Sequence, residues 1–182
     1  MRRSTNNEVE WFPSLIATSR SLGKIPRSLG HHDTLDFVPV DLAARVVVDL
    51  AMANLGGGLS CFNLVNHERT SWREMIPSIQ NHFETGGKGR KTVHWHVEEV
   101  ELDEWLAELV AIDNNDKITA AEIDELYPAI KLLDFFQAMT DNSSKLVFAT
   151  DKAVRHSETL RMGHVKAVDA DMMEKWLKRW DF

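Results

Sequence analysis

The stretch Glu10–Pro26 reads EWFPSLIATSRSLGKIP and carries the signals for an amphipathic helix and for its end. Its apolar residues and one serine share the spacing of a single helical face: Phe12, Leu15, Ile16, Ser19 and Leu22. Gly23 suits the position just after the last turn, and Pro26 cannot continue a helix. We therefore expect the chain to begin with a helix that packs through this face.

Helical patterns dominate the remainder of the chain. Helices are predicted after Asp41 and Ser71, around Leu102–Leu109, and in four later segments: from a Thr119/Glu122 capping box, through Phe136, near Asp151–Leu160 and over Asp171–Trp180. Strands are predicted at Leu35–Val38, Ser60–Asn66 and Thr92–Val97. The expected fold class is α/β (α+β), mainly helical with a small sheet of about three short strands. We predict a single domain over residues 1–182, with residues 1–9 flexible.

Composition narrows the function classes. The net charge of −7 argues against non-specific binding to nucleic acid or anionic membranes, which require a basic surface. The only cysteine is Cys61, so an internal disulfide is excluded and a reducing compartment is favoured. No apolar run approaches the about 20 residues of a membrane span, and no apolar stretch follows the N-terminal arginines. We predict a cytoplasmic protein.

Tyr127 and Lys131 spell Tyr-x-x-x-Lys, the catalytic spacing of short-chain dehydrogenases. That chemistry needs both side chains on one face of a continuous helix. Pro128 follows the tyrosine directly, which places Tyr127 at a helix cap and Pro128 at the first helical position. We therefore do not assign catalysis to this pair.

The glycines of NLGGGLSCF, residues 54–62, follow a predicted helix and precede a predicted strand. A dinucleotide-binding loop has the reverse order, so the cluster predicts a helix stop and a loop. Cys61 falls in the predicted strand, where a thiol is usually inert packing. No dinucleotide fingerprint occurs elsewhere, and no cofactor is predicted.

Two patterns could suggest a metal. AIDNNDKITAAE resembles a calcium loop, but Ala111 occupies the first ligand position and Asp116 the position that requires glycine. A capped helix start explains the same residues. His94 and His96 share one face of the predicted strand without a third ligand at motif distance. No metal is predicted.

The order of several longer segments is more specific than any single motif. They are EWFPSLIATSRSLGKIP, DFVPVDLAARVVVDLA, FNLVNHERTSWREMIPSI, VELDEWLAEL, PAIKLLDFFQAM and the final ETLRMGHV…MMEKWLKRW. Together, from about Glu10 to Trp180, they resemble the C-terminal part of a thioester reductase domain of fungal nonribosomal-peptide-synthetase-like and polyketide enzymes. These domains are extended short-chain dehydrogenases.

The resemblance implies a lobe that shapes the pocket for a carrier-tethered acyl thioester. In the family, a Rossmann half with the glycine fingerprint and the catalytic tyrosine and lysine precedes this lobe, so hydride transfer by this chain alone is not expected. PAIKLLDFF then falls on a late packing helix, with Tyr127 in place of the family's asparagine. We expect this helix to pack through an apolar stripe of Leu132, Phe135, Phe136 and Met139. The CFNLV strand would normally join the larger sheet, so we expect an uncovered apolar face and either a homodimer or docking on a partner synthase.

The resulting hypothesis is a reductase-derived pocket protein of secondary metabolism, independent of NAD(P)H. It would bind a hydrophobic or carrier-linked intermediate and promote a non-redox step such as cyclisation or isomerisation. The alternative is a non-catalytic binding or scaffold module, or a fragment, that completes a partner synthase in trans. No residue is assigned as acid or base. The candidate pocket residues are Trp11, Ser19, Arg20, His31, His32, His94 and His96.

Overall fold

The computed structural model describes residues 10–53, 56–86, 96–140 and 147–180, which form two compact units. Unit 1 comprises Met1–Asp33, Trp72–Ser143 and Ala170–Phe182, and unit 2 comprises Thr34–Ser71 and Ser144–Asp169. A single folding domain stays a prediction, and the predicted flexible residues 1–9 lie outside the described part. The mainly helical α/β class with small sheets is confirmed.

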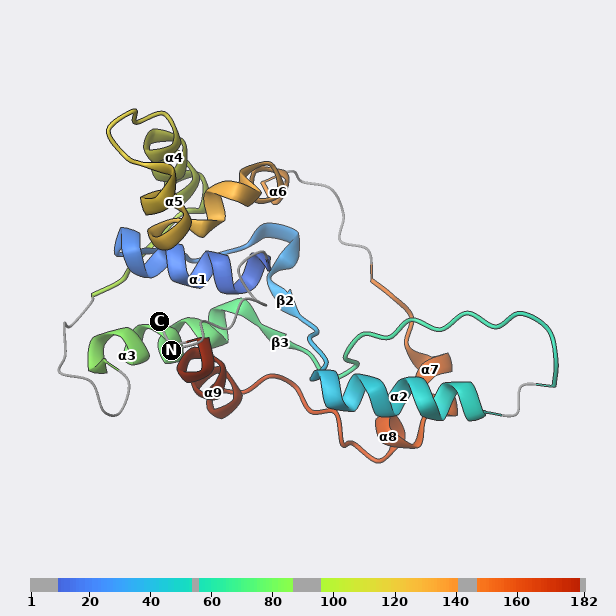
Figure 1. The fold of residues 1–182 in the computed structure, drawn as a ribbon. Coiled ribbons are helices and arrows are strands. Elements are labelled where there is room, and N and C mark those ends of the chain that lie inside the picture. The colour runs from blue at the N-terminus through green and yellow to red at the C-terminus, as the bar shows by residue number, and fades with distance from the viewer. Residues whose placement is uncertain (1–9, 54–55, 87–95, 141–146, 181–182) are drawn as a thin grey trace. The chain divides into compact units, whose positions relative to one another are not determined.

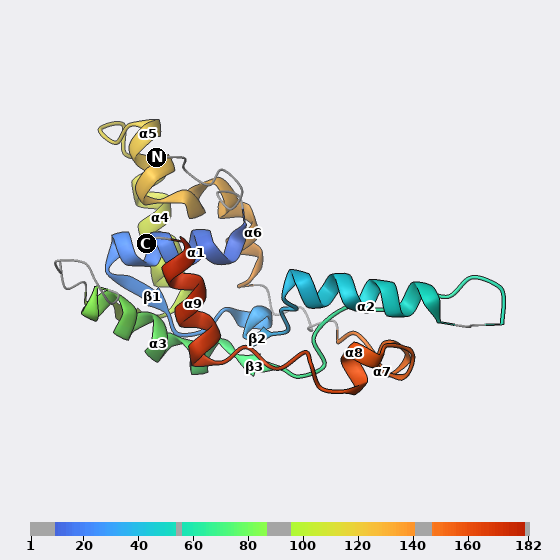
Figure 2. The ribbon, with the colours of Figure 1, turned by 60° about the horizontal axis from the view of Figure 1, so that its bottom comes forward.

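Unit 1 contains most of the helices (Figure 1). Its elements are α1 (Trp11–Leu22), β1 (Lys24–Pro26), the 3-10 helix η1 (Gly30–His32), α3 (Trp72–Thr85), β4 (Glu98–Val100), α4 (Leu102–Asp113), α5 (Ala120–Leu126), the 3-10 helix η2 (Pro128–Leu132), α6 (Leu133–Ala138) and α9 (Ala170–Trp180). Figures 1 and 2 both show α9 lying against α3.

The predicted apolar faces form the core of unit 1. The α4 face is buried as expected, through Leu102, Trp105, Leu106 and Leu109. Buried polar groups on α1 pair with the elements packed on it. Ser19 Oγ accepts a hydrogen bond of 3.1 Å from Trp105 Nε1, and Thr18 Oγ1 accepts one of 3.1 Å from the Ala129 backbone N–H. These bonds matter because an unsatisfied buried donor costs about 1–3 kcal/mol.

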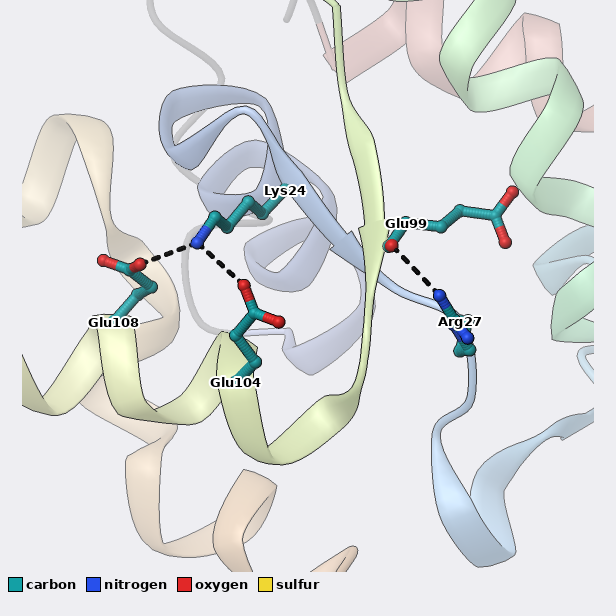
Figure 3. Close-up of polar contacts among 5 residues, drawn as sticks. All are labelled: Lys24, Arg27, Glu99, Glu104 and Glu108. Carbon is teal, nitrogen blue, oxygen red and sulfur yellow. Dashed lines mark hydrogen bonds and ion pairs between the residues drawn. The ribbon is translucent and has the colours of Figure 1, made fainter.

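A short parallel pairing of β1 with β4 links the end of α1 to the start of α4. Lys24 strengthens this link, because its Nζ donates to Glu108 Oε1 at 2.8 Å and to Glu104 Oε1 at 2.9 Å (Figure 3). Directly after β1, the Arg27 side chain donates to the Glu99 backbone oxygen at 3.3 Å (Figure 3). The two hydrogen bonds, to Glu108 and to Glu104, raise the pKa of Lys24 above its ordinary value.

Unit 2 packs α2 (Val40–Met52) against α7 (Asp151–His156) and α8 (Glu158–Arg161), with β2 (Thr34–Leu35) paired antiparallel to β3 (Thr70–Ser71). Its core consists of Val46, Ala153, Leu160 and Val165. Asn66, fully buried, ties the loops together by donating to the backbone oxygens of Phe37 at 3.0 Å and Lys166 at 2.8 Å. The buried amide thus holds segments that are far apart in sequence.

The strands differ from those predicted. Ser60–Asn66 is not a strand, and Cys61 is exposed rather than packed in a sheet. Only Leu35 of the predicted Leu35–Val38 strand lies in β2, and Thr92–Val97 precedes β4 and partly falls outside the described residues. The four described strands form two separate two-stranded sheets rather than one.

None of the described helices is long and apolar enough to cross a membrane.

Candidate functional site

Three half-buried aromatic side chains of unit 1, which we call the ring cluster, come from three different elements: Trp11, His32 and Phe135. The ring centroids of Trp11 and His32 are 5.7 Å apart, those of Trp11 and Phe135 are 5.8 Å apart, and those of His32 and Phe135 are 5.5 Å apart. These separations are typical of favourable aromatic pairs. His31 adjoins the cluster, with its ring centroid 4.3 Å from that of His32.

Hydrogen bonds to Asp33 and a close backbone approach at Gly30 fix the loop that carries the two histidines. The Asp33 carboxylate accepts from the Leu29 N–H at 2.6 Å and from the Ser28 hydroxyl at 2.7 Å. The Asp33 backbone oxygen accepts from the Trp72 N–H at 2.7 Å. Gly30 has a φ of 57°, and a Cβ at this position would overlap the Met139 backbone oxygen. A larger residue therefore cannot occupy position 30 in this arrangement.

One ring nitrogen of His31 lies in an unusual environment. His31 Nδ1 is buried without a hydrogen-bond partner in the described structure. Buried polar atoms are nearly always paired, so the unpaired Nδ1 is unusual, and Nε2 is the ring nitrogen left to contact a ligand. The site can therefore combine apolar packing on rings with polar contact through imidazole.

The structure brings Trp11, His31 and His32 together and places Ser19, Arg20 and His96 elsewhere. Ser19 is fully buried and its hydroxyl is bound by Trp105. Arg20 is half-buried in the last turn of α1. Whether any of the predicted residues binds a ligand stays a prediction.

Of the two histidines in the predicted strand, the structure describes only His96, which is not part of the ring cluster. His96 is mostly exposed, and its Nδ1 lies 3.2 Å from Glu84 Oε1. His94 lies outside the described residues. In the described part of the chain, no group of three or more His, Cys, Asp or Glu side chains is arranged to hold a metal ion.

Phe135 was expected only as part of a packing stripe with Leu132, Phe136 and Met139. Phe136 and Met139 are buried as that stripe requires, whereas Phe135 is half-buried and joins the ring cluster. No local signal separated Phe135 from Phe136, because neighbouring residues of a helix can both be buried, as Leu15 and Ile16 are on α1.

The Tyr-x-x-x-Lys spelling does not form a catalytic pair. Tyr127 ends α5 with φ −132° and ψ 52°, and Pro128 begins η2 as predicted. Lys131 instead pairs with Asp124 at 2.9 Å. The predicted capping box is also confirmed, since Thr119 and Glu122 exchange hydrogen bonds. These bonds, first of all from the Thr119 N–H, lower the pKa of Glu122.

Another histidine of unit 1, His82, is buried where α3 packs against α9. Its Nδ1 lies 3.1 Å from Glu174 Oε2, and Glu174 also accepts from Lys178 at 2.9 Å. Burial raises the pKa of Glu174, but the hydrogen bonds from Lys178 and His82 outweigh it, so the net shift is downward. Both side chains are occupied in holding the helices together, which argues for a structural role.

Known proteins that are similar to this chain include reductases and polyketide synthases. No model of a known protein family matches the chain. The chain is 29% identical over 97% of its length to a carboxylic acid reductase of Neurospora crassa, and 28% identical over 96% to an adenylate-forming reductase of Stachybotrys bisbyi. It is 27% identical over 96% of its length to a non-reducing polyketide synthase of Stachybotrys chartarum.

The predicted resemblance to thioester reductase domains is confirmed. The thioester reductase-like chain spans only 16%, 14% and 6% of the lengths of these three relatives, in the order given. It is thus related to segments of fungal biosynthetic reductases and polyketide synthases. Similarity to these segments does not assign the activities of the whole proteins to this chain.

Proposed function

We propose that this chain is a ligand-binding module of secondary metabolism, derived from a thioester reductase, that holds a hydrophobic or carrier-linked acyl intermediate. The observation that carries the proposal is the ring cluster of Trp11, His32 and Phe135, which presents partly exposed aromatic surface from two helices and the fixed loop of His32. Pockets for small molecules combine such apolar surface with a few placed polar groups. His31 supplies a polar group here.

We further propose that the module promotes a non-redox step, such as cyclisation or isomerisation, by holding a reactive conformer of the intermediate. Hydride transfer from a nicotinamide cofactor requires a dinucleotide-binding sheet and a tyrosine–lysine pair on one helix face. In the described structure the sheets have two strands each, and Tyr127 and Lys131 do not share a helix face, which favours a non-redox step. The alternative is a binding module without catalysis that completes a partner synthase. Exposed apolar side chains on α2, among them Val40, Val48 and Met52, favour association with a second copy or such a partner.

Binding of an acyl-pantetheine thioester, measured by calorimetry, tests the proposal. Phe135→Leu should weaken binding several-fold, because an aromatic contact contributes about 0.5–1.5 kcal/mol beyond its buried area. Phe148→Leu is the matched control, since Phe148 is 48% exposed in unit 2. Equal affinity of both variants and the unchanged chain would remove the ring cluster as the binding surface.

The catalytic part of the proposal needs a separate measurement. Mass spectrometry of the acyl-pantetheine after incubation with the chain should show a product of unchanged mass or of water loss, formed equally with and without NADPH. Binding without conversion would favour the non-catalytic module. An aldehyde or alcohol released together with free pantetheine only when NADPH is present would contradict the non-redox step.

A further inference from the structure

The two ring nitrogens of His31 are not equivalent. Nδ1 is buried and has no hydrogen-bond partner in the described part of the chain. His67 in unit 2 also has an unpaired, buried Nδ1, but its Nε2 lies 3.7 Å from Glu68. No such carboxylate lies at His31 among the described residues, although His31 adjoins a cluster of rings. The environment of His31 therefore differs from that of an ion-paired histidine.

The burial of Nδ1 selects one tautomer. A neutral imidazole has one N–H and one bare nitrogen, which is an acceptor only. Among backbone groups, a buried N–H without a partner is rarer than a buried acceptor without one, and we apply the same preference to the ring nitrogens. The bare nitrogen is then Nδ1, and the hydrogen is on Nε2, the nitrogen that is not among the buried unpaired atoms.

The nearest fixed carboxylate in the loop does not orient His31 as a base. Asp33 is occupied by the Leu29 N–H and the Ser28 hydroxyl. In histidine bases of the triad type, a carboxylate receives the hydrogen of Nδ1 and leaves Nε2 free to accept a proton. The arrangement at His31 is the opposite, with a donor at Nε2.

We infer that His31 is the polar anchor of the ring cluster, and that its Nε2–H donates a hydrogen bond to the acyl carbonyl oxygen of the bound ligand. The inference rests on the proposed function, because it takes the ligand to be an acyl compound whose apolar group packs on Trp11, His32 and Phe135. In this inference His31 recognises the carbonyl group and does not act as a general base.

The tautomer can be measured without any ligand. Long-range proton–nitrogen NMR correlations on the ¹⁵N-histidine-labelled chain near neutral pH should show His31 with hydrogen on Nε2 only. The His31→Gln variant identifies its signals by their loss. A hydrogen on Nδ1 would overturn the inference whether or not a ligand is found.

The contact to the carbonyl is tested with two probes, benzoyl-pantetheine thioester and the S-benzyl thioether, which keeps the ring but replaces the carbonyl by CH₂. The unchanged chain should bind the thioester about tenfold more tightly than the thioether, as one hydrogen bond allows. His31→Gln, whose amide N–H reaches the position of Nε2, should keep most of this preference. His31→Asn and His31→Phe should lose it.

The outcomes separate the two proposals. If the chain and His31→Phe bind both probes with the same thioester preference, the ring cluster remains a binding site and the role of His31 is wrong. If neither probe binds the unchanged chain, the proposed function fails and the carbonyl contact fails with it. Circular dichroism of each variant establishes that a loss of preference does not come from unfolding.

Discussion

Gly30 shows how a single residue controls the candidate site. It precedes His31 and His32, has a φ of 57°, and approaches the Met139 backbone so closely that no Cβ fits. Both requirements act on the same residue, because left-handed backbone is unfavourable for other residues and the overlap adds a steric cost. The position of the two imidazoles therefore depends on the absence of a side chain next to them.

Gly30→Ala should lower the free energy of unfolding of the chain by more than about 1–2 kcal/mol, the cost of left-handed backbone alone, and should weaken acyl-pantetheine binding. Gly23→Ala is the matched control in unit 1, since Gly23 has a φ of 67° but its Cβ would lie at an ordinary 3.5 Å from the nearest atom, the His96 oxygen. Urea denaturation compares the two variants. Equal losses of stability would show that the approach to Met139 is not a constraint in solution.

At the scale of single elements, α2 stabilises the start of α8 through one carboxylate. Asp49 Oδ2 accepts from the Thr159 N–H at 2.8 Å and from the Ser157 hydroxyl at 2.8 Å. Ser157 is also the N-cap of α8, accepting from the Leu160 N–H at 3.2 Å. These bonds, with that from the Thr159 N–H the largest, lower the pKa of Asp49.

Asp49→Asn should destabilise the chain by about 1 kcal/mol near neutral pH, the scale of a lost helix cap. A carboxylate with a lowered folded-state pKa contributes stability above its unfolded pKa of about 3.9 and loses it as pH falls through the folded value. The difference between the chain and the variant should therefore shrink only below about pH 4, in urea denaturation across pH. Asp116→Asn, a charge loss at an exposed residue outside the helices, should show neither effect.

Helices were predictable from sequence where the signal is local. The α4 face was predicted from apolar spacing, the Thr119 capping box from a capping signal and the break at Pro128 from a proline signal, and all three are confirmed. Such signals act within one or two turns, so the sequence contains them completely.

Strands were predicted less well, because a strand exists only through its partner. Ser60–Asn66 has strand-like composition, but in the described structure its only backbone-to-backbone hydrogen bond is that of the Asn66 N–H to the Asp36 oxygen. β1 was missed, since its three residues end in a proline that reads as a helix stop. It forms because β4 lies beside it.

The candidate site also has a part that could be predicted from the sequence and a part that could not. Trp11, His31 and His32 were predicted as candidates from residue type, and the fold brings them together. The hydrogen bond from Trp105 to Ser19 and the entry of Phe135 into the ring cluster depend on contacts between distant segments. Neither follows from local spacing, so residue type alone could not separate Ser19 from His31.

For the molecule as a whole, the exposed apolar face of α2 sets an expectation about association. Val40 is 85% exposed, Val48 61% and Met52 81%, and Leu59 beyond the helix is 96% exposed. Val40, Val48 and Met52 recur at helical spacing, so they form a stripe rather than scattered contacts. Clustered apolar side chains of this kind mark surfaces that bind other proteins.

We predict that the purified chain self-associates through this stripe, as light scattering at increasing concentration would show. The double variant Val48→Lys/Met52→Lys should weaken association by at least about tenfold, because each fully buried aliphatic side chain contributes about 1.5–3 kcal/mol. Glu68→Lys is the charge-matched control, since one reversal of sign changes the net charge by as much as two new lysines, and Glu68 is 60% exposed in unit 2. If the chain is a monomer that binds a hydrophobic dye, the stripe is exposed in the free chain, and a partner synthase becomes the expected binding partner. A monomer that binds no dye would contradict the expectation that this face is covered at all.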